Sequence, residues 1–290
     1  GNVTESTKTL DDGSVLHVFT ATNSPQMFPE PDMPPTWTQV EAVRLSTASD
    51  WRELSRWYWE LCAAHLAKTN AAMAAKVAEV TVDAKTPRAR LEAIFRFVSQ
   101  EIRYMGLTME DTSPGYAPHD VDITFANRYG VCRDKAGLLA ALLRLGGFEA
   151  FPVLINVGAK MDEEVPQPFF NHAIVAVDVG EGATGELGKG AHGRYLLMDP
   201  TNESTKDIFP SYLCDMSYLV ARPEGEGLRT SPVPSPDANA LEVVSTGRLD
   251  REGAIILEND LAFNGIHDTA FRGALVRQTA DDRRKFFDQR

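Results

Sequence analysis

The chain has 290 residues, of which 43% are hydrophobic and 24% are charged, the composition of a globular protein with enough chain for a sizeable core. Its 29 basic and 41 acidic side chains give a net charge of −12, which argues against binding to a nucleic-acid backbone. The sequence contains no apolar run long enough for a transmembrane helix and no signal peptide. Because the chain opens without Met, we expect that a leader has been removed from it.

The N-terminal part of the chain changes from a β pattern to a helical one. Residues 1–46 predict two strands around an Asp-Asp-Gly turn, a proline-rich connector and another strand at 36–46. Helical spacing starts after Asp50, a good N-cap, and continues to about residue 80. A second helix is predicted at 86–104, with Thr86 as its cap, and 106–126 is predicted to be a long ordered loop.

The central part of the chain predicts one helix followed by three strands. The helix begins near Cys132 and ends at Gly146-Gly147. Strands are predicted at 148–158, 171–179 and 194–198, and they should be antiparallel because the last connection is too short for a helical crossover. The fold class that this pattern indicates is α+β.

The C-terminal part predicts a connector, a hairpin and a helix. Residues 222–240 contain four prolines and read as a linker. The segment 241–263 reads as a hairpin that turns at 250–253, and a terminal helix is expected to start near Thr269. We find no internal repeat and no low-complexity segment.

Cys132 is the cysteine whose position suggests chemistry. The chain has three cysteines with no zinc-ligand spacing, so at least one thiol is free within the chain. Cys132 falls in the first turn of its predicted helix, where unpaired N–H groups and the helix dipole favour a thiolate and can also hold an oxyanion. Gly130 is expected to remove side-chain bulk from the approach. The alternative is that Cys132 is a small buried hydrophobic residue.

Two further residues supply possible partners for this thiol. His172 begins the second predicted strand and Asp199 ends the third, so antiparallel pairing should bring them together at one edge of the sheet. An imidazole held by a carboxylate is the partner that a cysteine nucleophile requires. Taken singly, a histidine on a strand is usually structural and an Asp before Pro is usually a turn former. A catalytic site is indicated by their order: a cysteine at a helix start, a histidine at a strand start and an aspartate at the end of the next strand.

Three motifs also resemble the bacterial transglutaminase-like superfamily, in the branch that carries its core between two β-rich domains. They are "GVCRDKA" at 130–136, the pair Asn171-His172, and "DPT" at 199–201, and the core resemblance covers roughly residues 85–220. The resemblance implies a papain-like fold with Cys132 as nucleophile, His172 as base and acid, and Asp199 as the residue that orients it. Val131 stands where the family usually has Asp, which puts substrate contacts in question.

On this resemblance we expect four segments. They are the tail of an N-terminal β-rich domain at 1–46, a transglutaminase-like core at 47–222, a linker at 223–240 and a partial C-terminal β-rich domain at 241–290. The resemblance also implies export from a bacterium, to the envelope or the medium.

The function expected is cysteine-dependent acyl transfer through a thioester. Hydrolysis of a peptide or other amide is favoured, and transamidation is the variant in which an amine replaces water. The partner would be a peptide or amide-bearing substrate, such as a protein, a cell-wall component or a glycan-linked amide. No cofactor, metal or nucleic acid is implied. The alternative, from another class, is a non-catalytic binding or scaffold module on the same fold.

Several other residues receive weaker interpretations. The basic pair Arg133 and Lys135 is read as a solvated face, and Asp134 in the first turn suits the helix dipole. Tyr104 and Tyr116 are candidates for a second oxyanion donor, with packing as the alternative. Cys62 and Cys214 are expected to be packed, and the remaining histidines are given no role.

Overall fold

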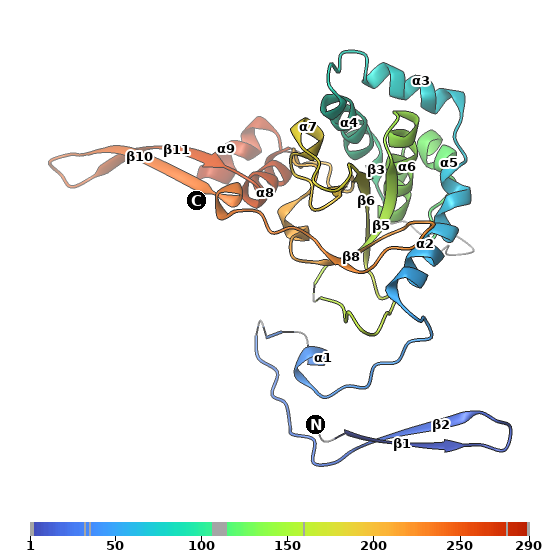
Figure 1. Cartoon of the computed structure of the whole chain (residues 1–290). Coiled ribbons are helices and arrows are strands. Elements are labelled where there is room, and N and C mark those ends of the chain that lie inside the picture. The colour runs from blue at the N-terminus through green and yellow to red at the C-terminus, as the bar shows by residue number, and fades with distance from the viewer. Residues whose placement is uncertain are drawn as a thin grey trace.

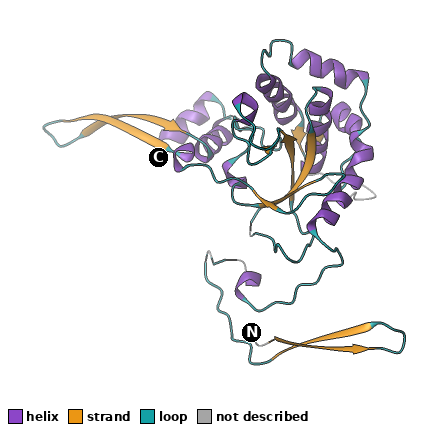
Figure 2. Ribbon diagram, viewed as in Figure 1, coloured by secondary structure: helices purple, strands orange, loops and turns teal. Residues whose placement is uncertain are grey.

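The computed structural model describes residues 3–31, 33–34, 36–105, 115–158, 160–276 and 278–288. It has the predicted α+β architecture, in which a five-stranded antiparallel sheet lies at the centre and helices pack against it (Figure 1). The strand order is β7-β6-β5-β8-β9. Two separate hairpins, one near each end of the chain, stand away from this sheet (Figure 2).

The central sheet contains the three consecutive strands that the sequence predicts, and two more. β5, β6 and β7 pair antiparallel in chain order, which confirms that prediction. β8 and β9 pair on the other side of β5, where no strand was predicted. The strands are β5 (Ala150–Asn156), β6 (His172–Asp178), β7 (Tyr195–Met198), β8 (Ser217–Val220) and β9 (Arg229–Thr230).

Five helices and a π-helical segment accompany this sheet in the described part of the chain before β5. They are α2 (Trp51–Leu66), α3 (Ala71–Val80), α4 (Pro87–Arg96), the π-helix Phe97–Glu101, α5 (Val121–Asn127) and α6 (Cys132–Leu145). Two predicted caps are confirmed, because Asp50 accepts the N–H of Glu53 at 2.8 Å and Thr86 accepts that of Ala89 at 3.2 Å.

Two predicted helices and one predicted loop differ in extent from the structure. The run from 50 to 80 is two helices, because Asn70 accepts the N–H of Met73 and so caps a new one. The α-helix that starts at Pro87 ends at Arg96 and gives way to the π-helix. Of the predicted loop, 106–114 lies outside the described residues and 121–126 is helical in α5.

α6 joins the helical layer to the sheet and carries Cys132 at its first position. It packs on β5 and β6, and its apolar side chains are buried almost without exception. Leu139 and Leu142 have no exposed surface, and truncation of either to Ala would cost about 2–5 kcal/mol. A rigid helix therefore holds the cysteine.

The chain ends are less regular than the core. The first hairpin pairs β1 (Val3–Thr9) with β2 (Val15–Ala21), and the second pairs β10 (Leu241–Leu249) with β11 (Ile255–Phe263), both as predicted. The strand expected at 36–46 is instead the short helix α1 (Thr36–Gln39). The terminal helix starts at Ile266 and is followed by another, as α8 (Ile266–Leu275) and α9 (Ala280–Asp288).

The remaining elements are short. They are the parallel pair β3 (Arg103–Tyr104) and β4 (Tyr129–Gly130), the helix α7 (Gly185–Gly188) and the 3-10 turns Ser211–Leu213 and Pro236–Asn239. None of the helices within the described residues is long and apolar enough to cross a membrane.

Candidate active site

The first turn of α6 is closed by Asp134. Its carboxylate accepts the backbone N–H of Val131 at 3.0 Å and that of His119 at 3.0 Å. A Cβ added to Gly130 would lie 2.6 Å from the Asp134 Cβ and 3.3 Å from a Thr124 methyl group. This glycine makes room for the capping carboxylate behind the cysteine.

The Cys132 thiol is half-buried and lies against His172. Burial opposes ionisation of the thiol, but a hydrogen bond and the charge of the imidazole outweigh it and lower the pKa of Cys132 below that of an ordinary thiol. The backbone N–H groups of Ala173 and Arg133 add to this stabilisation. The Arg133 N–H belongs to the start of α6, so the helix N-terminus contributes directly to the thiolate.

His172 connects the thiol to a buried carboxylate. It is the first residue of β6, and its Nε2 lies 3.0 Å from Asp199 Oδ2. Nδ1 is left as the ring nitrogen that can face the sulfur. Burial lowers the pKa of His172, but the hydrogen bonds and charges of Asp199 and Cys132 prevail and raise it from 6.5 to about 9.

Asp199 follows the last residue of β7 and has no exposed surface. Besides His172, it accepts the Tyr212 hydroxyl at 2.8 Å, the Thr201 N–H at 2.9 Å and the Thr201 hydroxyl at 2.7 Å. Burial raises its pKa, yet the bonds from His172 and Thr201 leave the pKa of Asp199 below the ordinary value. Sequence reasoning missed Tyr212, and no motif or spacing pointed to it.

The structure thus brings together all three residues singled out from the sequence. The lowered pKa of Cys132 and the raised pKa of His172 favour a thiolate–imidazolium pair near neutral pH. The other thiols differ, since burial raises the pKa of Cys62 to about 12 and also raises that of Cys214. None of the cysteines is in a disulfide.

The basic pair after Cys132, Arg133 and Lys135, is not the solvated face that was expected. Lys135 is fully buried, and its Nζ donates to the carbonyls of Ser99, at 3.2 Å, and Ile102. Burial lowers the pKa of Lys135 to about 8 in spite of the charges of Glu203 and Asp199. Lys135 therefore ties the start of α6 to the end of the π-helix.

The loop before His172 is fixed at several points. The Asn171 amide exchanges two hydrogen bonds with Val157, at 2.8 and 2.9 Å, and closes the β5–β6 connection. The Tyr116 hydroxyl donates to the carbonyls of Phe170, at 3.1 Å, and Pro168. Its hydroxyl supports this loop, so Tyr116 is no longer a candidate oxyanion donor.

The segment that leads into α2, together with the first residue of that helix, also holds this loop. Arg44 pairs with Asp162 at 2.6 Å, the Leu45 carbonyl accepts the Gln167 amide at 2.8 Å, and the Trp51 indole donates to the Glu163 carbonyl at 3.0 Å. We call residues 44–51 the N-terminal strap.

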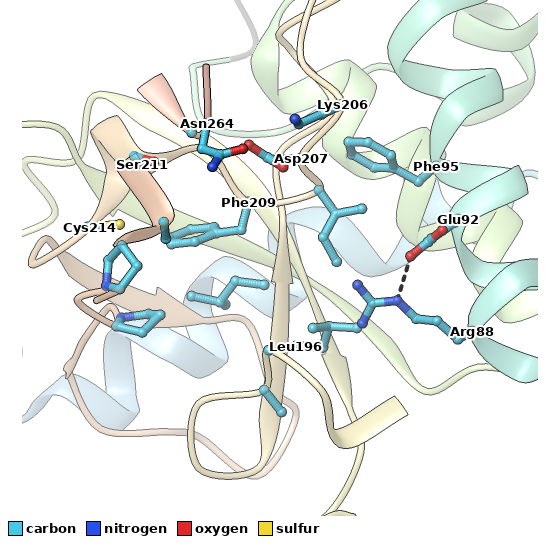
Figure 3. Close-up of a pocket in the computed structure, with 18 of the residues that line it drawn as sticks. Arg88, Glu92, Phe95, Leu196, Lys206, Asp207, Phe209, Ser211, Cys214 and Asn264 are labelled. Atoms are coloured by element: carbon cyan, nitrogen blue, oxygen red, sulfur yellow. Dashed lines mark hydrogen bonds and ion pairs between the residues drawn. The ribbon is translucent and has the colours of Figure 1, made fainter. Parts of the chain in front are cut away.

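A cavity of about 630 Å³ lies at the free edge of β7, between the core on one side and the linker with residues 264–265 on the other. Figure 3 shows its mixed lining, in which the Arg88–Glu92 ion pair and Phe95 come from the same helix, and Leu196 and Phe209 are further apolar side chains. Of the described residues that line it, none belongs to the Cys132 site.

Comparisons with known proteins bear on the fold and on one part of the chain. The family described as the transglutaminase-like superfamily matches residues 74–187. The solved structure of a candidate protease from Parabacteroides distasonis ATCC 8503 is similar with a TM-score of 0.52 and 13% identity, over 84% of this chain and 46% of that one. A candidate cysteine protease from Cytophaga hutchinsonii covers 90% of this chain and 75% of that one at a TM-score of 0.31 and 12% identity. No curated protein is similar at a significant level.

The fold is a papain-like α+β core. Within this fold, the match to the transglutaminase-like superfamily covers residues 74–187, less than half of the chain. This chain spans less than half the length of the Parabacteroides protein.

Proposed function

We propose that this chain is a cysteine-dependent enzyme that hydrolyses a peptide or other amide bond through a thioester. Cys132 is the nucleophile, His172 the acid and base, and Asp199 the residue that holds the imidazole. The observation that carries the proposal is that a thiol with a lowered pKa contacts an imidazole that is itself bound to a fully buried carboxylate.

The geometry supports a two-stage reaction. The thiolate attacks the carbonyl carbon, a C–S bond forms, and the carbonyl electron pair moves to oxygen. As the C=O bond re-forms, the C–N bond breaks and the His172 imidazolium gives its proton to the leaving nitrogen. Water then attacks the thioester and loses a proton to His172. The C–S bond breaks, and the acid leaves with the thiolate restored.

Asp199 acts in both stages by holding one imidazole orientation. Its bond to Nε2 directs Nδ1 towards the sulfur, and its negative charge stabilises the imidazolium. Val131, which departs from the superfamily pattern, caps α6 and contributes its N–H to Asp134. Within the described residues, the contacts given above for Cys132, His172 and Asp199 do not involve the Val131 side chain.

The proposal is tested by alkylation with iodoacetamide at roughly pH 6.5, where an ordinary thiol is almost entirely protonated. Cys132 is expected to react faster than Cys214 by at least about tenfold, because only its pKa is lowered. His172→Gln should abolish this advantage. His65→Gln, which breaks a similar 2.7 Å histidine–aspartate pair with Asp120, is the matched control and should leave it intact.

A screen of labelled peptides and amides, with Cys132→Ala as the blank, then identifies the product. A free acid indicates hydrolysis, and a new amide formed with an added amine indicates transamidation. If Cys132 reacts no faster than Cys214, or if His172→Gln leaves the rate unchanged, the proposed function is wrong.

A further inference from the structure

Four hydrogen bonds from described residues converge on the buried carboxylate of Asp199. Thr201 supplies two of them, both to Oδ1, from its backbone N–H at 2.9 Å and from its hydroxyl at 2.7 Å. The other two reach Oδ2, where His172 Nε2 lies at 3.0 Å and the Tyr212 hydroxyl at 2.8 Å. A carboxylate has about four lone-pair sites, so this one is saturated with donors. Tyr212 and His172 therefore share a single oxygen.

The chain around Tyr212 is held firmly against the carboxylate residue. The Asp199 N–H donates to the Ile208 carbonyl at 2.7 Å, so the segment that leads to the phenol also binds the Asp199 backbone. The residue after Tyr212, Leu213, has no exposed surface, and its carbonyl accepts the Ser231 hydroxyl at 2.5 Å. These contacts on both sides of Tyr212 fix the position from which its hydroxyl donates.

The direction of the carboxylate is set without the phenol. Thr201 lies two residues after Asp199 and binds Oδ1 through both its backbone and its side chain, as in an Asx turn. Without the Tyr212 hydroxyl, Oδ2 would still face His172 but would carry one donor fewer. A hydrogen bond to a carboxylate stabilises its charged form, so the loss of that donor makes the carboxylate more basic. It would then hold a protonated imidazole more strongly.

We propose that Tyr212 is a positioning residue that acts through Asp199, by donating to the same oxygen that binds His172 and so limiting how tightly the imidazolium is held. This inference rests on the proposed function. In the first stage of that reaction, His172 gives its proton to the leaving nitrogen, and in the second it takes a proton from water. An imidazole that is held too tightly in its charged form does neither efficiently.

The phenol keeps the proton that this role requires. Burial and the negative charge of Asp199 raise the pKa of Tyr212, so its hydroxyl remains a donor over the range in which His172 loses its proton. The hydroxyl thus opposes the effect of the carboxylate on the imidazole at every pH at which the reaction runs.

The test measures the pKa of His172 by NMR titration of its imidazole, with His172→Gln to assign the signal. The full chain carries Cys132→Ala, so that the thiol does not titrate together with the ring. Tyr212→Phe should raise the pKa of His172 by roughly 0.5–1 pH unit, because a hydrogen bond to a charged group is worth about 1–2 pH units at the carboxylate and only part of this reaches the ring. Tyr195→Phe, the matched control, removes a 2.7 Å phenol–carboxylate bond to Glu226 at the other end of β7 and should leave this pKa unchanged.

A second measurement connects this shift to the reaction. With p-nitrophenyl acetate, the burst of p-nitrophenol reports acylation of Cys132, and the slower phase reports hydrolysis of the thioester. The pH of half-maximal hydrolysis should rise in Tyr212→Phe by the same amount as the pKa of His172, because the neutral ring is the base in that step. Alkylation by iodoacetamide near neutral pH should change by less than about threefold, since the thiolate–imidazolium pair persists.

Three results would overturn the assignment. An unchanged pKa of His172 in Tyr212→Phe means that the phenol does not act on the shared oxygen. A lower pKa means that Tyr212 orients the carboxylate instead of limiting its hold on the ring. An equal rise in Tyr195→Phe means that the change is not specific to the site. Failure of the proposed function looks different, because wild-type Cys132 would then alkylate no faster than Cys214, whatever the titration of His172 gives.

Discussion

Replacement of Asp199 by Asn tests the contribution of the buried carboxylate. Asn has nearly the same shape but lacks the charge that stabilises the His172 imidazolium. The pKa of His172 rises from 6.5 to about 9, with Asp199 as the leading favourable cause. At roughly 1.4 kcal/mol per pH unit, this corresponds to about 3 kcal/mol, or on the order of 10²-fold in the population of the charged ring.

The assay is the rate of Cys132 alkylation as a function of pH. For a histidine with a raised pKa, the stabilisation of the charged ring is fully present below 6.5 and is lost as the pH rises through about 9. In the wild-type protein the thiolate should therefore persist below the ordinary thiol pKa of 9.0. In Asp199→Asn, alkylation near neutral pH should fall by on the order of 10²-fold and recover above the ordinary thiol pKa.

The matched control is Asp120→Asn, which removes the carboxylate of the distant His65 pair at 2.7 Å. Its pH profile should be that of the wild-type protein. A profile for Asp199→Asn that also stays unchanged would refute the reasoning, because the Cys132–His172 pair would then not depend on the carboxylate. Circular dichroism of each variant separates this result from unfolding.

Three further predictions concern stability and reactivity. Gly130→Ala should lower the free energy of unfolding, measured in urea, by about 1–3 kcal/mol, because the new methyl group meets Asp134. Gly227→Ala is the control and should change this free energy by less than about 0.5 kcal/mol, because a Cβ there meets nothing within 4 Å. Lys135→Met should destabilise by about 2–4 kcal/mol in the same assay, because it leaves two buried carbonyls without their donor, and wild-type stability would contradict this. Cys62, whose pKa burial raises to about 12, should resist iodoacetamide in the native protein and react only in denaturant, as mass spectrometry of peptides can show.

Local signals predicted a large part of the fold. Asp50 and Thr86 cap helices as their types and positions suggested, because an N-cap depends on a few neighbouring residues. The order of the strands predicted that His172 and Asp199 would meet, and their side chains lie 3.0 Å apart. The catalytic roles assigned to the three site residues remain predictions until the thiol is assayed.

The sequence could not predict features that depend on distant partners. Lys135 can be buried because carbonyls 33 and 36 residues earlier accept hydrogen bonds from its ammonium group. Its charge alone had suggested a side chain exposed to solvent. α5 is a short helix stabilised by tertiary packing, with Phe125 buried and Arg128 stacked on its ring at 4.8 Å. Tyr212 reaches Asp199 from a 3-10 turn, which has no periodic pattern.

The N-terminal strap has a practical consequence for producing this protein in pieces. The residues matched by the superfamily, 74–187, would leave behind both the strap and Asp199. A recombinant fragment trimmed to that length would keep the nucleophile but lose the carboxylate, and the loop leading to His172 would lose its clamp. The smallest piece worth expressing for activity therefore starts before Arg44 and extends past Tyr212.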